Sequence, residues 1–341
     1  MRPNLAIVGA TGAVGEIMRQ VVAERKIPFT SIKFLASEKS AGKPISFLGK
    51  EYRVELIRPE AFIGVDIALS STPASVSKEI SPMAAAKGAI VIDNSSAWRM
   101  DPDVPLVVPE VNAHALRSIP KGIIANPNCS TIQMVVALQP LHAFAKIKRV
   151  VVSTYQASSG KGAKAVQELE SQIKEYSRSG TIPQATVHAD RLFGNVLPHD
   201  WKPGEDGYSE EEWKMILETR KIMGVPDLQI CPTTVRVPVR VCHSESLVVE
   251  FYSPISPAQA KEILIKSPGI IVQDDPHGKN VPLALDCEGK DEVFVGRIRT
   301  DPTVQHGLAL WVVADNLRKG AATNAVQIAQ ELLRMGIPKA K

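Results

Sequence analysis

One cysteine of this chain stands in a setting that suits a nucleophile. Asn126-Pro127-Asn128-Cys129-Ser130-Thr131 follows a short apolar stretch, Gly122–Ala125, and precedes a segment of helical character that begins near Cys129. The first N–H groups of a helix lack intrahelical partners and stabilise an anion, so this position favours the thiolate. The sequence therefore predicts that Cys129 attacks a carbonyl carbon and that the same N–H groups stabilise the resulting oxyanion.

A glycine-rich turn near the start of the chain predicts a dinucleotide site. Gly9-Ala10-Thr11-Gly12-Ala13-Val14-Gly15 follows the predicted strand Leu5–Val8 and opens a helix. Glycines let the backbone turn tightly and approach a pyrophosphate, which then rests on the helix N-terminus. A glycine-rich turn alone is weak evidence for such a site, but its place between the first strand and an amphipathic helix favours a nicotinamide cofactor.

The end of the second predicted strand bears on which cofactor binds. Lys39, Ser40 and Lys43 offer cationic and hydroxyl groups to a 2′-phosphate, which favours NADP. The alternative is that Glu38 holds the ribose hydroxyls of NAD, as an acidic residue does in many such sites.

The elements that must position these residues fall into two patterns. Strands and helices alternate over the first 125 residues, which predicts a Rossmann-type parallel sheet. The strands are expected at Leu5–Val8, Ile32–Leu35, Asp66–Ser70, Ala89–Ile92, Leu106–Val108 and Gly122–Ala125, and the helices at Ala13–Lys26, Ser75–Lys87 and Asn112–Arg117.

After a helix over about 129–144, longer β-branched runs predict an α+β catalytic and dimerisation domain with a mainly antiparallel sheet. Its strands are expected at Lys148–Tyr155, Val235–Val241, Leu247–Tyr252, Val293–Ile298 and Leu308–Ala314, and its helices at Ala163–Ser177 and Glu210–Met223. Residues 180–208 are predicted to form a long structured loop. A last helix, Asn316–Met335, is expected to return to the first domain, so the domains are predicted as 1–128 plus 317–341, which binds NADP, and 129–316.

Composition narrows the class of protein. A net charge of +4 suits an anionic small substrate, and the lack of a basic run excludes a nucleic-acid surface. The chain has neither a signal-peptide layout nor an apolar run of about 18–20 residues, so a soluble, cytoplasmic protein without membrane partners is expected. The four cysteines, Cys129, Cys231, Cys242 and Cys287, form no Cys-x-x-Cys pair, so no metal site is predicted.

Several segments in order along the chain together resemble aspartate-semialdehyde dehydrogenase, and they cover nearly all of it, from residue 5 to about 330. They are Gly9–Gly15, Ser40–Lys43, Asp93–Arg99, Val107–Asn112, Asn126–Thr131, Ser153–Gly160, Glu211–Met215, Arg236–Val239, His243–Glu245, Phe294–Arg299 and Asp315–Leu317. The resemblance implies NADPH-dependent reductive dephosphorylation of 4-phospho-L-aspartate to L-aspartate 4-semialdehyde. The reaction releases phosphate and serves the biosynthesis of lysine through diaminopimelate, of threonine and of methionine. It also implies a homodimer at least.

The resemblance assigns the chemistry to two residues. Cys129 matches the nucleophile, which expels phosphate from the acyl phosphate and leaves a thioester for the hydride to reduce. His243 matches the acid/base, which takes the thiol proton and later protonates the thiohemiacetal oxygen, because imidazole titrates near neutral pH.

The resemblance assigns substrate binding to six residues, and the chemistry of each suits its task. Arg236 matches the clamp on the α-carboxylate, since a planar guanidinium binds a carboxylate in bidentate fashion. Glu211 matches the carboxylate that faces the substrate ammonium, and Gln156 matches a residue that positions the substrate near the nucleophile. Asn128 precedes the nucleophile and is expected to donate to phosphate or to the oxyanion. Lys214 and Arg99 match the pair that holds phosphate. Without the resemblance, Glu211 and Lys214 would be interpreted as an ordinary exposed ion pair.

Cofactor residues also follow from the resemblance. Thr11, Gly12, Ala13 and Val14 match the pyrophosphate turn, Lys39 and Ser40 match the 2′-phosphate site, and Ser159, Gly160 and Asn316 match positions near the nicotinamide. The sequence departs from the family pattern at Ser70-Ser71-Thr72-Pro73, where Pro73 removes a backbone N–H group.

Three alternatives remain open from the sequence. N-acetyl-γ-glutamyl-phosphate reductase uses the same cysteine and histidine to form and reduce a thioester. The amine of its substrate is acylated, however, which leaves no role for Glu211. Glyceraldehyde-3-phosphate dehydrogenase has a different nucleophile context and an acidic residue at the end of the second strand. A catalytically silent binding relative is expected to have lost Cys129 or His243, and both are present.

Overall fold

The chain divides into two compact units, each with one six-stranded sheet. The computed structural model describes residues 2–275 and 277–336. One unit runs up to Pro127 and resumes at Ala321, and the other is Asn128–Gly320. The domain boundaries expected from the sequence, 128/129 and 316/317, stay predictions, and residues 337–341 of the predicted cofactor domain lie outside the described residues.

The sheet of the first unit is entirely parallel, which confirms the predicted Rossmann-type class. Its spatial order is β5 (Glu55–Leu56), β2 (Ser31–Ala36), β1 (Asn4–Val8), β6 (Ile67–Ser70), β7 (Ile90–Asp93) and β8 (Ile123–Ala125). The order reverses at β1 and β6, and the carboxyl ends of strands on either side of such a reversal form the usual crevice for a dinucleotide.

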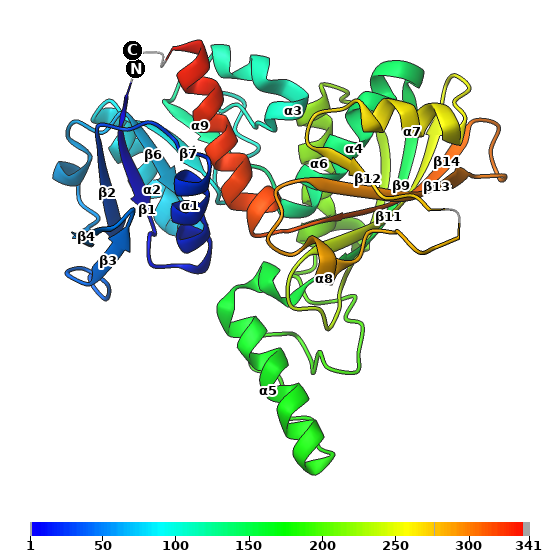
Figure 1. Cartoon of the computed structure of the whole chain (residues 1–341), viewed down its shortest axis with the longest axis horizontal. Helices are drawn as coiled ribbons and strands as arrows, with labels where there is room; N and C mark the ends of the chain where they lie inside the picture. Colours follow the sequence, from blue (N-terminus) through cyan, green and yellow to red (C-terminus); the bar gives the residue numbers. More distant parts are fainter. Residues whose placement is uncertain (1, 276, 337–341) are drawn as a thin grey trace. The chain divides into compact units, whose positions relative to one another are not determined.

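Helices cover both faces of this sheet (Figure 1). The chain moves from β1 to β2 in one direction and from β6 to β7 in the other, and right-handed crossovers therefore place α1 (Ala13–Glu24) and α2 (Ala74–Ala86) on opposite faces. The last helix, α9 (Thr323–Met335), packs beside α1 and buries Val326, Ala329 and Leu332 in the same core. The expected return of the C-terminal helix to this sheet is thus confirmed.

Some boundaries in the first unit differ from those expected. The segment Leu106–Val108 is not a strand, because only Leu106 pairs with Ala125, as an isolated bridge. The helix expected at Asn112–Arg117 is instead α3 (Pro109–Asn112) followed by a 3₁₀ turn, Ala113–Arg117. The sequence analysis also missed the hairpin of β3 (Pro44–Phe47) and β4 (Lys50–Arg53).

The sheet of the second unit is mixed and mainly antiparallel, as predicted. Its order is β10 (Gln229–Arg236), β9 (Ile147–Gln156), β11 (His243–Phe251), β14 (Gly307–Ala314), β13 (Val293–Thr300) and β12 (Ile270–Val272), with the three central pairings antiparallel. The strand expected at Val235–Val241 is wrong beyond Arg236. Pro238 has no N–H group for a ladder, and Val239 donates to the carbonyl of Val237 in a tight turn.

Three helices line one face of this sheet: α6 (Glu210–Met223), α4 (Cys129–Ala145) and α7 (Pro257–Ile265). Because α4 packs on the sheet and between the other two helices, most of its residues are buried. Asn128 caps its first turn. Ser209 and Glu212 form a capping box that begins α6, so each helix starts at a fixed residue.

The helix α5 (Ala163–Ser179) stands apart from the sheet of its own unit, and the loop 180–208 folds back along it (Figure 1). Glu168 accepts N–H groups of the loop at Val187 (2.8 Å) and His188 (3.0 Å). Gln172 accepts those of Leu192 and Phe193, both at 3.0 Å. Buried Leu169 and Leu192 pack together, so the loop has a defined path, as expected.

Residues 316–320 close the second unit, and the chain then leads through residues 321–322 into α9. The helix expected over Asn316–Met335 is regular only from Thr323, because a π-helical turn, Arg318–Ala322, precedes it. Across residues 2–275 and 277–336, no helix combines the length and the apolar character that a membrane span requires.

Candidate active site

Cys129 is the first residue of α4, and its helix start is already capped. The side-chain oxygen of Asn128 accepts the N–H groups of Ser130 (3.0 Å) and Thr131 (3.1 Å). The N–H group of Asn128 donates to a Glu218 oxygen at 2.6 Å. These three N–H groups are engaged within the protein. Stabilisation of an oxyanion at this helix start stays a prediction.

The half-buried Cys129 lies against the turn that ends the second unit. A Cβ atom added to Gly320 would lie 2.8 Å from the Cβ atom of Cys129, closer than side chains tolerate. Glycine at this position therefore lets the backbone approach the cysteine, which fixes one wall of the site.

Three of the predicted substrate residues meet around the buried carboxylate of a fourth, Glu211, which lies in the first turn of α6. One of its oxygens accepts from Asn128 Nδ2 (2.8 Å) and from Gln156 Nε2 (3.3 Å) at the end of β9. Its other oxygen pairs with Lys214 Nζ at 3.2 Å. Burial would raise the pKa of the Glu211 carboxyl, but the charge of Lys214 and these hydrogen bonds hold it below its usual value. Glu211 is therefore an anion beside the cysteine helix.

His243 opens β11 and is fully buried. Its Nδ1 accepts the N–H group of Ala157 at 3.0 Å, and its Nε2 is buried without a partner among the described residues. A neutral imidazole has one donor and one acceptor nitrogen, so this contact assigns the proton to Nε2. Burial and the positive charge of Arg236 lower the pKa of the ring well below its usual value, so it stays neutral. His243 thus offers an N–H donor at Nε2.

The buried imidazole sets an expected pH dependence of stability. Its pKa is lower in the folded state than the ~6.5 of an unfolded chain, so below that pH the unfolded state binds the additional proton. The free energy of unfolding should therefore fall as pH drops below about 6.5, with His243 contributing a slope of up to about 1.4 kcal/mol per pH unit.

Urea denaturation of the parent and of His243→Gln between pH 7 and pH 5 measures this contribution. The variant should show the flatter dependence. His142→Gln is the graded comparison, because half-burial and the charge of Lys146 lower the pKa of His142, and it should flatten the curve less. Equal slopes for the parent and His243→Gln would contradict the neutral imidazole.

Arg236 ends β10 beside His243, with only 2% of its surface exposed. Its Nε donates to Asp200 at 2.9 Å, its Nη1 donates to the carbonyl of Ala157 at 2.8 Å, and its guanidinium lies 4.6 Å above the ring of Trp201. A Cβ atom at Gly160 would stand 2.8 Å from Nη1 and 3.1 Å from the imidazole. The glycine therefore leaves the guanidinium and the imidazole room to occupy one site.

The sequence analysis missed Asp200 and Trp201, which hold this arginine. Both lie in the loop 180–208, whose sequence carries no periodicity and no recognisable motif. The only signal in the sequence for this contact is an aspartate in a proline-rich loop, and that signal indicates no particular partner.

Asn316 joins the predicted residue Ser159, which precedes Gly160, to the residue just before β11. Its side-chain oxygen accepts from Ser159 Oγ and from the N–H group of Cys242, both at 3.0 Å. The turn Ser158–Lys161 is thus tied to the peptide that precedes His243. The role of these residues near a nicotinamide stays a prediction.

In the first unit, the glycine turn has the shape that a pyrophosphate site needs. Gly9 has φ +78°, and a Cβ atom there would collide with the carbonyl of Ser71. A Cβ atom at Gly15 would collide with the carbonyl oxygen of Gly9. Gly12 is the N-cap residue of α1 and is exposed to solvent. Thr11, Gly12 and Ala13 are exposed at the helix start, followed by half-buried Val14. The residues fit a phosphate group at this N-terminus.

The predicted 2′-phosphate residues lie beside this turn. Thr11 Oγ1 donates to Ser40 Oγ at 3.1 Å, so the two loops meet. A hollow of about 530 Å³ adjoins them, with Ser37, Glu38 and Lys39 on its polar side and Leu56, Ile57, Val76 and Ile80 on its apolar side. Its composition fits an adenosine group with a phosphate at the polar edge.

Arg99 also belongs to the first unit. Its Nε and Nη2 donate to the backbone carbonyls of Asn126 and Asn94, both at 3.0 Å, and its side chain is buried. These contacts hold the guanidinium beside the end of β7. Its role with Lys214 in binding phosphate stays a prediction.

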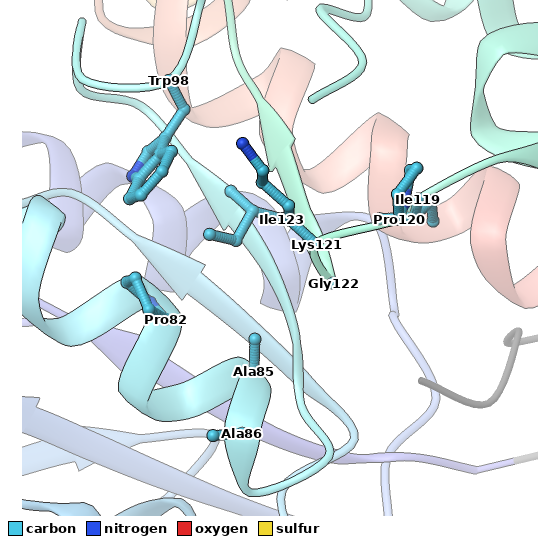
Figure 2. A pocket seen from close by; sticks show the side chains of 9 residues that line it. All are labelled: Pro82, Ala85, Ala86, Trp98, Ile119, Pro120, Lys121, Gly122 and Ile123. Carbon is cyan, nitrogen blue, oxygen red and sulfur yellow. The ribbon is translucent and has the colours of Figure 1, made fainter. Parts of the chain in front are cut away.

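A second hollow in this unit, of about 320 Å³, contains none of the predicted site residues (Figure 2). The end of α2, Trp98 and the start of β8 form its largely apolar wall. Lys121 at its edge pairs with Asp101 (2.6 Å) and Asp103 (3.5 Å). Within the part of the chain that the structure describes, no group of three potential metal ligands occurs.

Comparisons with known proteins agree with this geometry. Residues 4–119 match the family model "Semialdehyde dehydrogenase, NAD binding domain", and residues 138–319 match "Semialdehyde dehydrogenase, dimerisation domain". The aspartate-semialdehyde dehydrogenase of Aquifex aeolicus is 53% identical over 336 residues, which are 98% of this chain and 99% of that protein. The Bacillus subtilis enzyme of the same name is 46% identical over 98% of each chain. Aspartate semialdehyde dehydrogenase II of Vibrio cholerae complexed with ASA has a TM-score of 0.96 and 43% identity, and the match covers 99% of this chain and 100% of that chain.

Proposed function

The chain belongs to the aspartate-semialdehyde dehydrogenase family, and from this premise we propose how its residues carry out the reaction. It is an oxidoreductase that interconverts 4-phospho-L-aspartate with L-aspartate 4-semialdehyde and phosphate. The observation that carries the assignment is the buried Glu211 anion, with Asn128, Gln156 and Lys214 around it, at the start of the cysteine helix. An anion in that place suits a free ammonium, whereas an acylated amine carries no positive charge for it to bind.

The substrate is proposed to lie between two charged groups of the second unit. Arg236 binds the α-carboxylate through the guanidinium hydrogens that Asp200 and Ala157 do not use. Glu211 accepts from the ammonium, and Lys214 turns its charge toward the phosphate. Arg236 and Glu211 thus bind two groups on the same α-carbon, and Lys214 binds the phosphate at the other end, so the reacting carbonyl meets Cys129 in one orientation.

Cys129 is proposed to attack as the thiolate: its Sγ bonds to the acyl phosphate carbon, the bond to phosphate breaks, and a thioester remains on the protein. NADPH, when bound, supplies the hydride for the thioester carbon, after which the C–S bond breaks and releases the aldehyde and the thiolate. His243 Nε2–H donates to the carbonyl oxygen in both steps. Taking the thiol proton would require the other tautomer, in which Nδ1–H would face the N–H group of Ala157.

The cofactor is NADP(H), and the first unit supplies its phosphate contacts. The exposed start of α1, with Thr11, Gly12 and Ala13, suits the pyrophosphate, and Lys39 and Ser40 suit the 2′-phosphate. Gly9 and Gly15 let the turn pack closely enough to present these groups.

The protein acts as a homodimer. We propose that the sheet face left open by α4, α6 and α7 forms the contact, since Tyr155 and Trp311 stack there at 5.4 Å. We also propose a cytoplasmic location, since the cysteine must stay reduced for the chemistry and all four cysteines are free thiols.

One coupled assay tests substrate and cofactor together. Purified protein should reduce NADP when L-aspartate 4-semialdehyde and phosphate are both present, and omitting phosphate should stop the reaction. NAD in place of NADP should give slower turnover. N-acetylglutamate semialdehyde with phosphate should give none, because its amide cannot pair with Glu211. A protein that binds NADP but turns over neither semialdehyde would overturn the proposed function.

A further inference from the structure

The carboxylate of Asp200, in the loop 180–208, collects four hydrogen-bond donors. One of its oxygens accepts from Arg236 Nε (2.9 Å) and His188 Nδ1 (3.1 Å). The other accepts from Lys161 Nζ (2.6 Å) and the N–H group of Ala189 (2.8 Å). The side chain is fully buried, and burial would raise the pKa of the carboxyl, but these donors lower it strongly instead. Asp200 is therefore a permanent anion with both oxygens in use.

The contact to Arg236 decides which edge of the guanidinium remains available. A guanidinium has five N–H donors, one on Nε and two on each Nη atom. Asp200 occupies Nε, and the carbonyl of Ala157 occupies one hydrogen of Nη1. Trp201 covers one face of the group. Three donors remain, one on Nη1 and two on Nη2, and one hydrogen from each nitrogen can bind a carboxylate through two parallel bonds.

A chain of two hydrogen bonds, from Asp200 through His188 to Ser158, also holds the carboxylate of Asp200. Because an ionised carboxylate only accepts, His188 Nδ1 must carry a proton, and Nε2 of the same ring shares a hydrogen bond of 2.9 Å with Ser158 Oγ. Ser158 and His188 are both buried, and Ser158 precedes the Ser159–Gly160 turn of the site. These hydrogen bonds thus join the loop 180–208 to the turn Ser158–Lys161, in which Gly160 leaves room for Arg236.

Charge also favours this arrangement. Arg236 is buried and Lys161 is partly exposed, and together they bring two positive charges to the one negative charge of Asp200. The excess positive charge at Arg236 suits one further carboxylate.

We propose that Asp200 is the positioning residue for recognition of the substrate α-carboxylate, and that His188 and Ser158 hold it in place. The inference rests on the proposed function. It adds that the loop 180–208 acts on the reaction through Arg236, without touching the substrate.

The first test is Asp200→Asn, with Glu170→Gln as the matched control. All four partners of Asp200 are donors, so the amide nitrogen of asparagine would face a donor whichever way it turns. Glu170 is also a carboxylate paired with an arginine, Arg240, at 2.8 Å, but both are exposed. Asp200→Asn should raise KM for L-aspartate 4-semialdehyde about 10- to 100-fold. KM for phosphate should change less than about threefold, and Glu170→Gln should leave both KM values unchanged.

Two substitutions of His188 keep the inference testable if Asp200→Asn does not fold. The amide nitrogen of asparagine stands where Nδ1 does and still donates to Asp200, whereas the longer glutamine reaches toward Ser158 instead. His188→Asn should therefore keep KM for the semialdehyde within about threefold, and His188→Gln should raise it about tenfold. A merely structural role for His188 predicts similar losses in both variants.

The outcomes separate this inference from the proposed function. If the parent protein fails to turn over L-aspartate 4-semialdehyde, the proposed function is wrong. If the parent is active but Asp200→Asn lowers kcat while KM for the semialdehyde stays the same, or raises both KM values equally, the positioning role is overturned.

Discussion

Cys129→Ala should abolish turnover of L-aspartate 4-semialdehyde, with a loss of kcat of roughly 10⁵-fold or more, because the sulfur forms the covalent bond to the substrate. Cys129→Ser should be severely impaired as well, since a hydroxyl is a far weaker nucleophile. The measurement is the rate of NADP reduction at saturating semialdehyde and phosphate.

Cys231→Ala is the matched control, because Cys231 is an exposed thiol in the same unit. It should keep parental activity. The Cys129→Ala protein should still bind NADP and should unfold at the parental temperature, which shows that the fold is intact. If Cys231→Ala lost as much activity as Cys129→Ala, the nucleophile would be misassigned.

Arg236→Lys should lower kcat/KM for the semialdehyde about 100- to 1,000-fold, although the charge is kept. The guanidinium simultaneously meets Asp200, Ala157 and Trp201, and it keeps a planar edge for the substrate carboxylate. An ammonium group has no such edge, so each charge-assisted bond that is lost costs about 1.5–3 kcal/mol. Steady-state kinetics with varied semialdehyde measures this loss.

Arg240→Lys is the control for that change. Arg240 lies four residues further on and pairs with Glu170 while exposed, so lysine should serve as well there. Its kcat/KM should stay within about threefold of the parent. An Arg236→Lys enzyme with parental kcat/KM would contradict the role of the bidentate edge.

Local signals in the sequence explain which elements could be predicted. The helix Glu210–Met223 is found where it was expected, because Ser209, Glu212 and Gly224 mark its two ends within the sequence itself. The strand expected at Val235–Val241 runs too far because β-branched residues continue past the point at which the chain leaves the sheet. Alternation of side chains does not show where a pairing partner ends.

The candidate site shows the same limit. Glu211 and Lys214 lie three residues apart, and their ion pair follows from helical spacing. The contact of Asp200 with Arg236 joins residues 36 positions apart, and the loop 180–208 that carries Asp200 has no period from which to infer it. Nor does the sequence show that Asn128 and Glu218 occupy the N–H groups at the cysteine helix, because Glu218 meets Asn128 only after α6 packs beside α4.

That occupied helix start has a consequence for electrophilic inhibitors. A carbonyl compound designed to bind its oxygen to the backbone N–H groups at the start of a cysteine helix would find those of Asn128, Ser130 and Thr131 already taken. A compound whose oxygen reaches His243 Nε2 would find a buried donor in need of an acceptor. Selectivity over enzymes that use a backbone oxyanion hole can therefore be built into the angle at which an inhibitor presents its oxygen to the imidazole.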